Sequence, residues 1–219
     1  MILRLIILVR WRLNPPSDFS FTCGTVILQS LMNLALQITF LRILLAPFFA
    51  WAMIKSPEDP NHLWTALILA LLMEATDFFD GYIARKLNLE SDAGKILDPM
   101  ADSIARLTCF IAFFKIGHAS VWMILVFVYR DSLVSALRIL AASRTIILGA
   151  RGSGKLKAVA QAISISGIPI ILLAEHYQIS LYLQSSTIIL TLMLIAVAGT
   201  LYSLWDYIYA NRHLISRLI

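Results

Sequence analysis

The segment from Asp77 to Asp102 reads DFFDGYIARKLNLESDAGKILDPMAD. It places four aspartates, at positions 77, 80, 98 and 102, in sequence that is otherwise apolar enough to form membrane-spanning helices. Ionisable groups are costly inside a bilayer, so they usually mark a functional site. We therefore expect the functional site to lie in this segment and the fold to be organised around it.

The spacing of the aspartates predicts two helical pairs. Asp77 and Asp80 are three residues apart, and Asp98 and Asp102 are four apart, so each pair lies on one face of a helix. The polar segment 86–92 predicts a turn at the membrane surface. The two helices then carry their aspartates at matched depths, roughly 13–15 Å for the deeper ones at 1.5 Å per residue. If the helices pack antiparallel, the four carboxylates converge.

Four converging carboxylates require cations for neutralisation. An all-oxygen ligand set suits Mg²⁺ or Mn²⁺ rather than zinc, and two divalent ions would balance the charge. Two-metal sites serve in-line displacement at phosphorus. Gly81 and Gly94 lack side chains, which allows a backbone or a ligand to approach closely. The alternative is that the aspartates only pair with lysine or arginine residues.

The same segment matches the pattern D-x-x-D-G-x-x-A-R-x8-G-x3-D-x3-D without a gap and so resembles the CDP-alcohol phosphotransferase family. The fixed positions are occupied by Asp77, Asp80, Gly81, Ala84, Arg85, Gly94, Asp98 and Asp102. The resemblance implies transfer of a substituted phosphate from a CDP-linked donor to an alcohol, with release of CMP. It also implies a homodimer.

The resemblance further assigns a role to each matched position. Asp77, Asp80 and Asp98 are implied to be chiefly metal ligands, with Asp98 essential for catalysis. Asp102 is implied to be the general base and also to contact metal. The implied nucleotide-binding residues are Thr39, Gly81, Ala84, Arg85 and Gly94.

The composition is that of an integral membrane protein. Of its 219 residues 59% are hydrophobic, and the mean hydropathy is +0.81. The formal net charge is +5, but the basic residues cluster beside apolar segments, which favours anchoring at a lipid bilayer surface over nucleic-acid binding. Cys23 and Cys109 are too few and too isolated for a disulfide framework or a zinc site.

The apolar segments predict an all-α protein with six transmembrane helices. The predicted helices occupy residues 34–54, 64–85, 94–116, 119–142, 158–174 and 186–209, and a loop at 143–154 precedes the fifth. Six spans place both termini on one side. Most lysine and arginine residues outside the spans fall on that side too, so the positive-inside rule predicts cytoplasmic termini and a cytoplasmic active site in the cell (inner) membrane.

Residues 1–31 contain an apolar run that is too short to span a bilayer. Two interpretations are open: an interfacial helix, or an upstream extension, because the resemblance begins at Met32. We therefore divide the chain into an N-terminal extension or interfacial segment, 1–31, and a transmembrane catalytic domain, 32–219. We expect residues 1–31 to be dispensable.

Three further charged residues lie in the predicted spans. Arg42, with Thr39, matches a T-x-x-R motif of the family's first helix; it needs a partner unless it extends to the membrane interface. Glu74 lies three residues before Asp77, outside the motif, and we expect it to pair with Arg42 or a later arginine. Arg106 lies one turn beyond Asp102, where it either tunes the charge of that aspartate or balances the cluster.

A set of basic residues in the fourth and fifth predicted helices indicates an anionic acceptor. R-D-x6-R followed by G-K-x-K resembles the R-E-x6-R and G-K-x-K-T-x-x-Q of bacterial phosphatidylglycerophosphate synthases, with Asp131 in place of Glu and Ala158 in place of Thr. The residues expected to bind the acceptor's phosphate are Arg130, Arg138, Lys155 and Lys157. The resemblance thus implies transfer of a phosphatidyl group from CDP-diacylglycerol to glycerol 3-phosphate.

Other functions stay open. Within the family, the acceptor could be an inositol phosphate, serine, choline, diacylglycerol or phosphatidylglycerol, and choline or diacylglycerol would not need the basic residues. A separate interpretation is that these basic residues only anchor the cytoplasmic surface. A UbiA-type prenyltransferase is also helical and rich in aspartate, but its motifs do not require Gly94 or the run from Asp80 to Arg85. A non-enzymatic cation or proton transporter could use intramembrane carboxylates as well.

Overall fold

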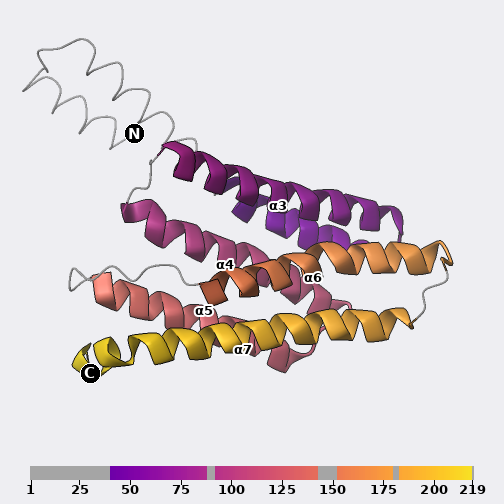
Figure 1. The fold of residues 1–219 in the computed structure, drawn as a ribbon. Coiled ribbons are helices and arrows are strands. Elements are labelled where there is room, and N and C mark those ends of the chain that lie inside the picture. Colours follow the sequence, from indigo (N-terminus) through magenta and orange to yellow (C-terminus); the bar gives the residue numbers. More distant parts are fainter. Residues whose placement is uncertain (1–39, 88–91, 143–151, 180–182, 219) are drawn as a thin grey trace, which may run out of the picture.

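The computed structural model describes residues 40–87, 92–142, 152–179 and 183–218, with backbone alone at 77–87, 92–98, 142 and 213–218. The regular structure of these residues is entirely helical. The helices run lengthwise along one bundle, and consecutive helices point in opposite directions (Figure 1). This confirms the predicted all-α class for the described part of the chain.

Six helices make up the described residues. A helix at residues 40–55 comes first. The others are α3 (Asn61–Leu87), α4 (Asp92–Lys115), α5 (Val121–Ala142), α6 (Gly152–His176) and α7 (Ser185–Leu218). They occur in the predicted order. The N-terminal segment 1–31 and Thr39 lie outside the described residues.

Two helix boundaries differ from the prediction by more than the others. The sequence predicts a loop up to residue 154, but α6 begins at Gly152. The side chain of Ser153 donates a 2.6 Å hydrogen bond to Asp206 of α7. Gly152 and Gly154 each disfavour helix by about 1 kcal/mol, and this contact with a neighbouring helix compensates for them. At the other boundary, α7 continues through Arg212 to Leu218 rather than ending near residue 209. Extending an existing helix is favourable once it is nucleated.

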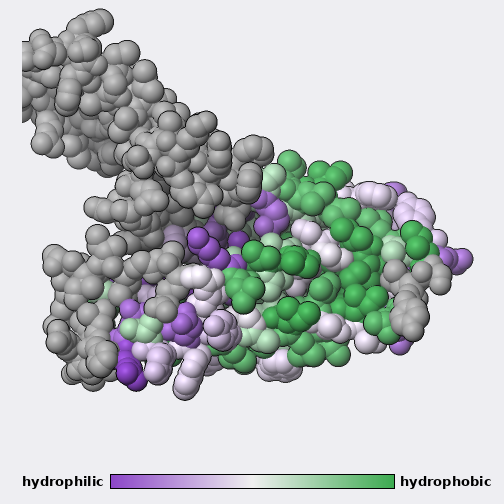
Figure 2. Space-filling model, viewed as in Figure 1, coloured by the Kyte–Doolittle hydropathy of each residue, from purple (hydrophilic) through white to green (hydrophobic). Residues whose placement is uncertain are grey.

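The surface of the bundle is that of a membrane protein. Large apolar side chains such as Trp51, Leu71, Leu125 and Trp205 are exposed. Figure 2 shows apolar residues over the middle and right of the bundle and hydrophilic residues gathered toward the left, where α5 and α7 end. Within the described residues, two segments have the length and hydropathy of a bilayer span: Gly152–His176 and Ser185–Arg212. The protein thus crosses the membrane through helical spans.

Aromatic residues of the 40–55 helix, α4 and α5 fill the core. The ring of Phe113 packs edge-on against Phe49 and Phe110, with centroids 5.8 and 6.0 Å apart. Phe110 also contacts Phe127 at 4.5 Å. Cys109 is buried beside them and packs as a small apolar residue.

Small residues allow α6 and α7 to approach closely. Gly167 faces Leu192 so tightly that an added Cβ would meet its Cδ1 at 3.3 Å. The hydroxyl of Ser164 donates to the carbonyl of Leu192 at 3.2 Å. Gly199 lies against Lys157, whose Cα would be 3.8 Å from an added Cβ. This close packing is typical of transmembrane helix pairs, and it brings the side chain of Lys157 into the bundle.

Candidate active site

The four aspartates lie on two consecutive helices. Asp77 and Asp80 belong to α3, and Asp98 and Asp102 belong to α4. Asp77 lies ten residues before the end of α3, and Asp102 lies ten residues after the start of α4. The backbone therefore carries the pairs at matched distances from residues 88–91. Of the four side chains, that of Asp102 is described.

The proposed nucleotide-binding positions are helical where the structure describes them. Gly81, Ala84 and Arg85 lie on α3, and Gly94 lies on α4. Only the backbone is described at these four positions. Their roles remain predictions.

Asp102 has an arginine partner from another helix. Its carboxylate forms an ion pair with the guanidinium of Arg42, which belongs to the 40–55 helix. The Arg42 side chain is only 6% exposed, against 26% for Asp102. Of the two interpretations of Arg42, the one that requires a partner is therefore confirmed. An ion pair this deep in a bundle fixes the position of both side chains, because separating them would leave a buried charge without a partner.

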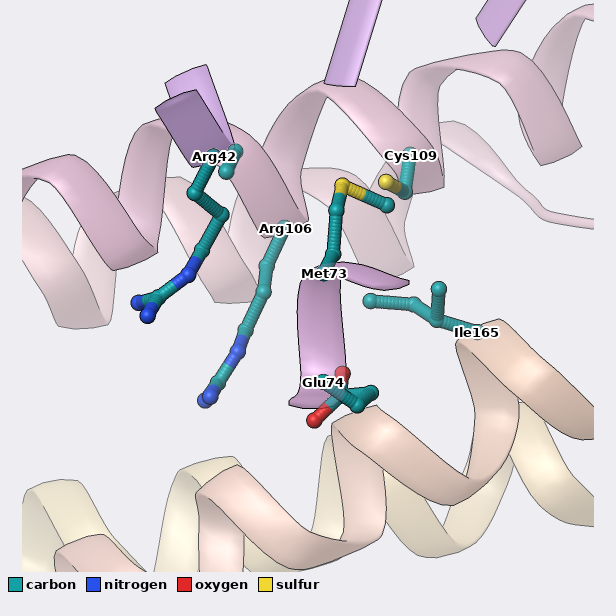
Figure 3. Close-up of a pocket in the computed structure, with 7 residues that line it drawn as sticks. Arg42, Met73, Glu74, Arg106, Cys109 and Ile165 are labelled. Carbon is teal, nitrogen blue, oxygen red and sulfur yellow. The ribbon is translucent and has the colours of Figure 1, made fainter. Parts of the chain in front are cut away.

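A small pocket lies one helical turn beyond Asp102 (Figure 3). Arg42, Glu74 and Arg106 supply its charged groups, and its other lining residues are Met73, Ala105, Cys109 and Ile165. Figure 3 shows the guanidinium groups of Arg42 and Arg106 pointing in the same direction, with the Glu74 carboxylate across from them. The pocket next to Asp102 therefore has two cationic groups on one side and a carboxylate on the other, and apolar side chains line the rest of it.

A second polar cluster joins α5, α6 and α7. The Asp131 carboxylate accepts hydrogen bonds from Arg130 at 3.0 Å and from Lys157 at 2.5 Å. Arg130 also donates to the hydroxyl of Ser203 at 2.7 Å. Arg130 and Lys157 are both buried. Two cations thus share one carboxylate inside a membrane bundle, and the cluster as a whole is positively charged.

The other two predicted acceptor residues, Arg138 and Lys155, have different surroundings. Arg138 places its guanidinium over the ring of Tyr207, 6.0 Å from the centroid, and its Nε has no hydrogen-bond partner. Lys155 is exposed, whereas Lys157 is buried. Two positions along a helix correspond to about 200° of rotation, so the two lysines point to opposite sides.

The buried polar face of α7 was not predicted from the sequence. Thr200, Ser203 and Tyr207 are almost fully buried, and they follow a three-then-four spacing that places them on one helix face. Gln161 donates to the Thr200 hydroxyl at 3.4 Å, and Arg130 donates to Ser203. The spacing of these residues in an otherwise apolar helix was a readable signal, because polar residues in a span face the protein interior.

The aspartate set fits a hard divalent cation by its donor chemistry. All four side chains offer oxygen ligands, and the segment from Asp77 to Asp102 contains no histidine or cysteine. Among the side chains that the structure describes, no three metal-ligating groups converge; those of Asp77, Asp80 and Asp98 are not among them.

Comparison with protein-family models matches residues 32–202 to CDP-alcohol phosphatidyltransferase. The chain is 32% identical over 184 residues to CDP-diacylglycerol–glycerol-3-phosphate 3-phosphatidyltransferase of Bacillus subtilis (strain 168), covering 83% of this chain and 92% of that protein. It is 27% identical to the Haemophilus influenzae protein of the same name, covering 80% and 91%. A third relative of that name, from Cereibacter sphaeroides, is 34% identical over 59% of each chain.

Proposed function

The chain belongs to the CDP-alcohol phosphatidyltransferase family, and from this premise we propose that it transfers a phosphatidyl group from CDP-diacylglycerol to glycerol 3-phosphate. The products are phosphatidylglycerophosphate and CMP, which makes the protein an enzyme of phospholipid biosynthesis. The observation that carries the choice of acceptor is the buried cluster of Arg130 and Lys157 around Asp131, with Arg138 nearby. Three cations outnumber the two carboxylates in this region, those of Asp131 and Asp206, and this leaves net positive charge for a phosphate.

Enzymes of this family depend on metal, and for this chain we propose Mg²⁺ or Mn²⁺, as two ions held by Asp77, Asp80, Asp98 and Asp102. Bound there, the ions would neutralise the diphosphate of the donor and stabilise the leaving CMP. Asp98 is essential for catalysis in this proposal because it is one of the four metal ligands, and losing any one ligand impairs the metal site.

Asp102 acts as the general base in this mechanism. Its carboxylate accepts the proton of the acceptor hydroxyl, whose oxygen attacks the phosphorus of the phosphatidyl group. The bond from that phosphorus to the oxygen of CMP breaks, and CMP leaves. The ion pair with Arg42 holds the carboxylate of Asp102 in place for this step. The motif match supports Thr39, Gly81, Ala84, Arg85 and Gly94 as the cytidine-diphosphate site.

The acceptor's phosphate binds between α5, α6 and α7. Arg130, Arg138 and Lys157 approach it from the interior. Lys155 is exposed near the start of α6 and lies at the entrance, where it attracts anionic substrate from the cytoplasm.

We further propose six membrane spans with both termini and the active site in the cytoplasm. The lengths of α3, α4 and α5, 27, 24 and 22 residues, support this, because each exceeds the ~20 residues that a bilayer core requires. The family match begins at residue 32, which supports treating residues 1–31 as a separate N-terminal segment and residues 32–219 as the catalytic domain. The family resemblance also supports a homodimer.

Purified protein in lipid nanodiscs, supplied with CDP-diacylglycerol, Mg²⁺ and a panel of alcohols, tests this function through CMP release. The panel includes glycerol 3-phosphate, inositol phosphate, serine and choline. We expect glycerol 3-phosphate to give the fastest release. Faster release with another acceptor would overturn the acceptor assignment but not the family.

A further inference from the structure

Two opposite charges lie one helical turn beyond the deeper aspartates. Glu74 precedes Asp77 by three residues on α3, and Arg106 follows Asp102 by four residues on α4. Glu74 lies 13 residues before the end of α3, and Arg106 lies 14 residues after the start of α4. The two levels of aspartates on these helices are therefore followed by a third level, which holds one carboxylate and one guanidinium.

This third level adjoins the ion pair of Arg42 with Asp102 at the pocket shown in Figure 3. The pocket has a volume of about 10 Å³, which leaves room for about one water molecule. The guanidinium groups of Arg42 and Arg106 point in the same direction, and the Glu74 carboxylate lies across from them. With so little water between them, these charges interact more strongly than charges at an exposed surface.

The positive and negative charges at this pocket balance. Arg42 is paired with Asp102, and Arg106 is four residues from the same aspartate, a spacing at which helical side chains interact. Among the described side chains at and beside the pocket, the carboxylates are those of Glu74 and Asp102. Without Glu74, Asp102 would therefore face two guanidinium groups, each able to occupy both of its oxygens.

We propose that Glu74 is a positioning residue, which holds Arg106 and keeps it away from Asp102. Asp102 then pairs with Arg42 alone, and its side chain, which is 26% exposed, keeps an accessible oxygen for the acceptor hydroxyl. This inference rests on the proposed function, because it takes Asp102 as the general base. It gives a role to Glu74, which lies outside the aspartate motif and acts through Arg106 rather than on the substrate.

Glu74→Gln and Arg106→Gln test the proposal as single variants. In Glu74→Gln, Arg106 turns to Asp102, because a cation in the bundle interior requires a partner. CMP release at saturating substrates should then fall by about tenfold or more, the size expected within one ion-pair network. The KM values for both substrates should change by less than about threefold. Arg106→Gln removes the competing cation and should lower the rate by less than about threefold.

The double variant separates this role from a purely structural one. In Glu74→Gln/Arg106→Gln the competing guanidinium is absent, so the rate should return to within about threefold of the wild-type rate. Mn²⁺ affinity, measured by electron paramagnetic resonance without substrates, gives a second readout, because Asp102 is also a proposed metal ligand. It should fall by about tenfold in Glu74→Gln and recover in the double variant.

Two further variants serve as controls. Glu74→Asp keeps the negative charge and should retain more activity than Glu74→Gln. Glu175→Gln removes an exposed carboxylate near the end of α6, outside the pocket lining, and should change neither the rate nor the Mn²⁺ affinity. If Glu74→Gln does not fold, a folded and active double variant supports the same role, and an unfolded one contradicts it.

Three results would overturn the inference. Wild-type rate and Mn²⁺ affinity in Glu74→Gln mean that Glu74 does not keep Arg106 from Asp102. A double variant that is at least as impaired as Glu74→Gln makes the two residues structural. Equal losses in Glu74→Asp and Glu74→Gln make the shape of the side chain, rather than its charge, the cause. Failure of the proposed function is distinguishable, because the unmutated protein would then not release CMP with glycerol 3-phosphate.

Discussion

Arg42 and Asp102 form an ion pair that joins the 40–55 helix to α4. The pair matters because Asp102 is the last aspartate of the motif, and its partner lies on a helix outside the motif segment. Mutating Arg42 therefore probes whether this helix contributes to the active site.

Arg42→Met should destabilise the protein and lower the rate of CMP release, whereas Arg42→Lys should restore part of both. Removing one partner of a buried pair typically costs roughly 3–5 kcal/mol, since the remaining charge is left unpaired. Thermal unfolding in nanodiscs and CMP release at saturating substrates measure the two effects. Wild-type stability and activity in Arg42→Met would show that the pair does not matter.

Asp98→Asn should abolish CMP release while the protein remains folded. The amide keeps the size of the side chain but loses the negative charge that a divalent cation requires. The measurement is a titration of CMP release with Mg²⁺, alongside the unfolding midpoint. Near-normal activity at saturating Mg²⁺ would contradict the role of the four carboxylates as a metal site.

Arg138→Ala should raise the KM for glycerol 3-phosphate by about 10- to 150-fold, which is the value of one charge-assisted contact. The KM for CDP-diacylglycerol should change little. This comparison holds where substrate dissociates faster than it reacts. Equal damage to both substrates would place Arg138 at the diphosphate or in the scaffold.

The exposed and buried lysines of α6 should behave differently. Lys157→Ala should strongly impair both folding stability and acceptor binding, because it leaves Asp131 with one cation fewer. Lys155→Ala should weaken acceptor binding less, and high salt should reduce its effect, since an exposed charge acts at long range and is screened. Steady-state kinetics at two ionic strengths distinguish the two variants. A larger and salt-independent loss for Lys155→Ala would contradict the inferred geometry.

Protein expressed from Met32 onward should insert into membranes and retain activity, because residues 1–31 precede the family match. CMP release per mole of inserted protein is the appropriate measurement. If the shortened protein inserts but has lost activity, residues 1–31 belong to the working enzyme.

The sequence predicted the helices well because their signal is local. The apolar runs and the spacing of Asp77, Asp80, Asp98 and Asp102 needed no tertiary information. The predicted start of α6 was too late. The hydrogen bond from Ser153 to Asp206 of α7 outweighs the low helix propensity of two glycines, and the local sequence does not reveal this contact.

Contacts between side chains of different helices could not be predicted in the same way. The sequence indicated that Arg42 needed a partner but not that the partner was Asp102, since that depends on how the 40–55 helix packs. By contrast, the opposite orientation of Lys155 and Lys157 follows from helix geometry alone. The buried face formed by Thr200, Ser203 and Tyr207 was also readable from spacing.

The most direct test of the central claim follows label from the acceptor into lipid. Purified protein in nanodiscs is incubated with labelled glycerol 3-phosphate, CDP-diacylglycerol and Mg²⁺, and both lipid-soluble label and CMP are quantified. We predict equimolar labelled phosphatidylglycerophosphate and CMP, and loss of both on chelation of the metal or in Asp102→Asn. Absence of label from lipid, while CMP is released with a different alcohol, would contradict the proposed function.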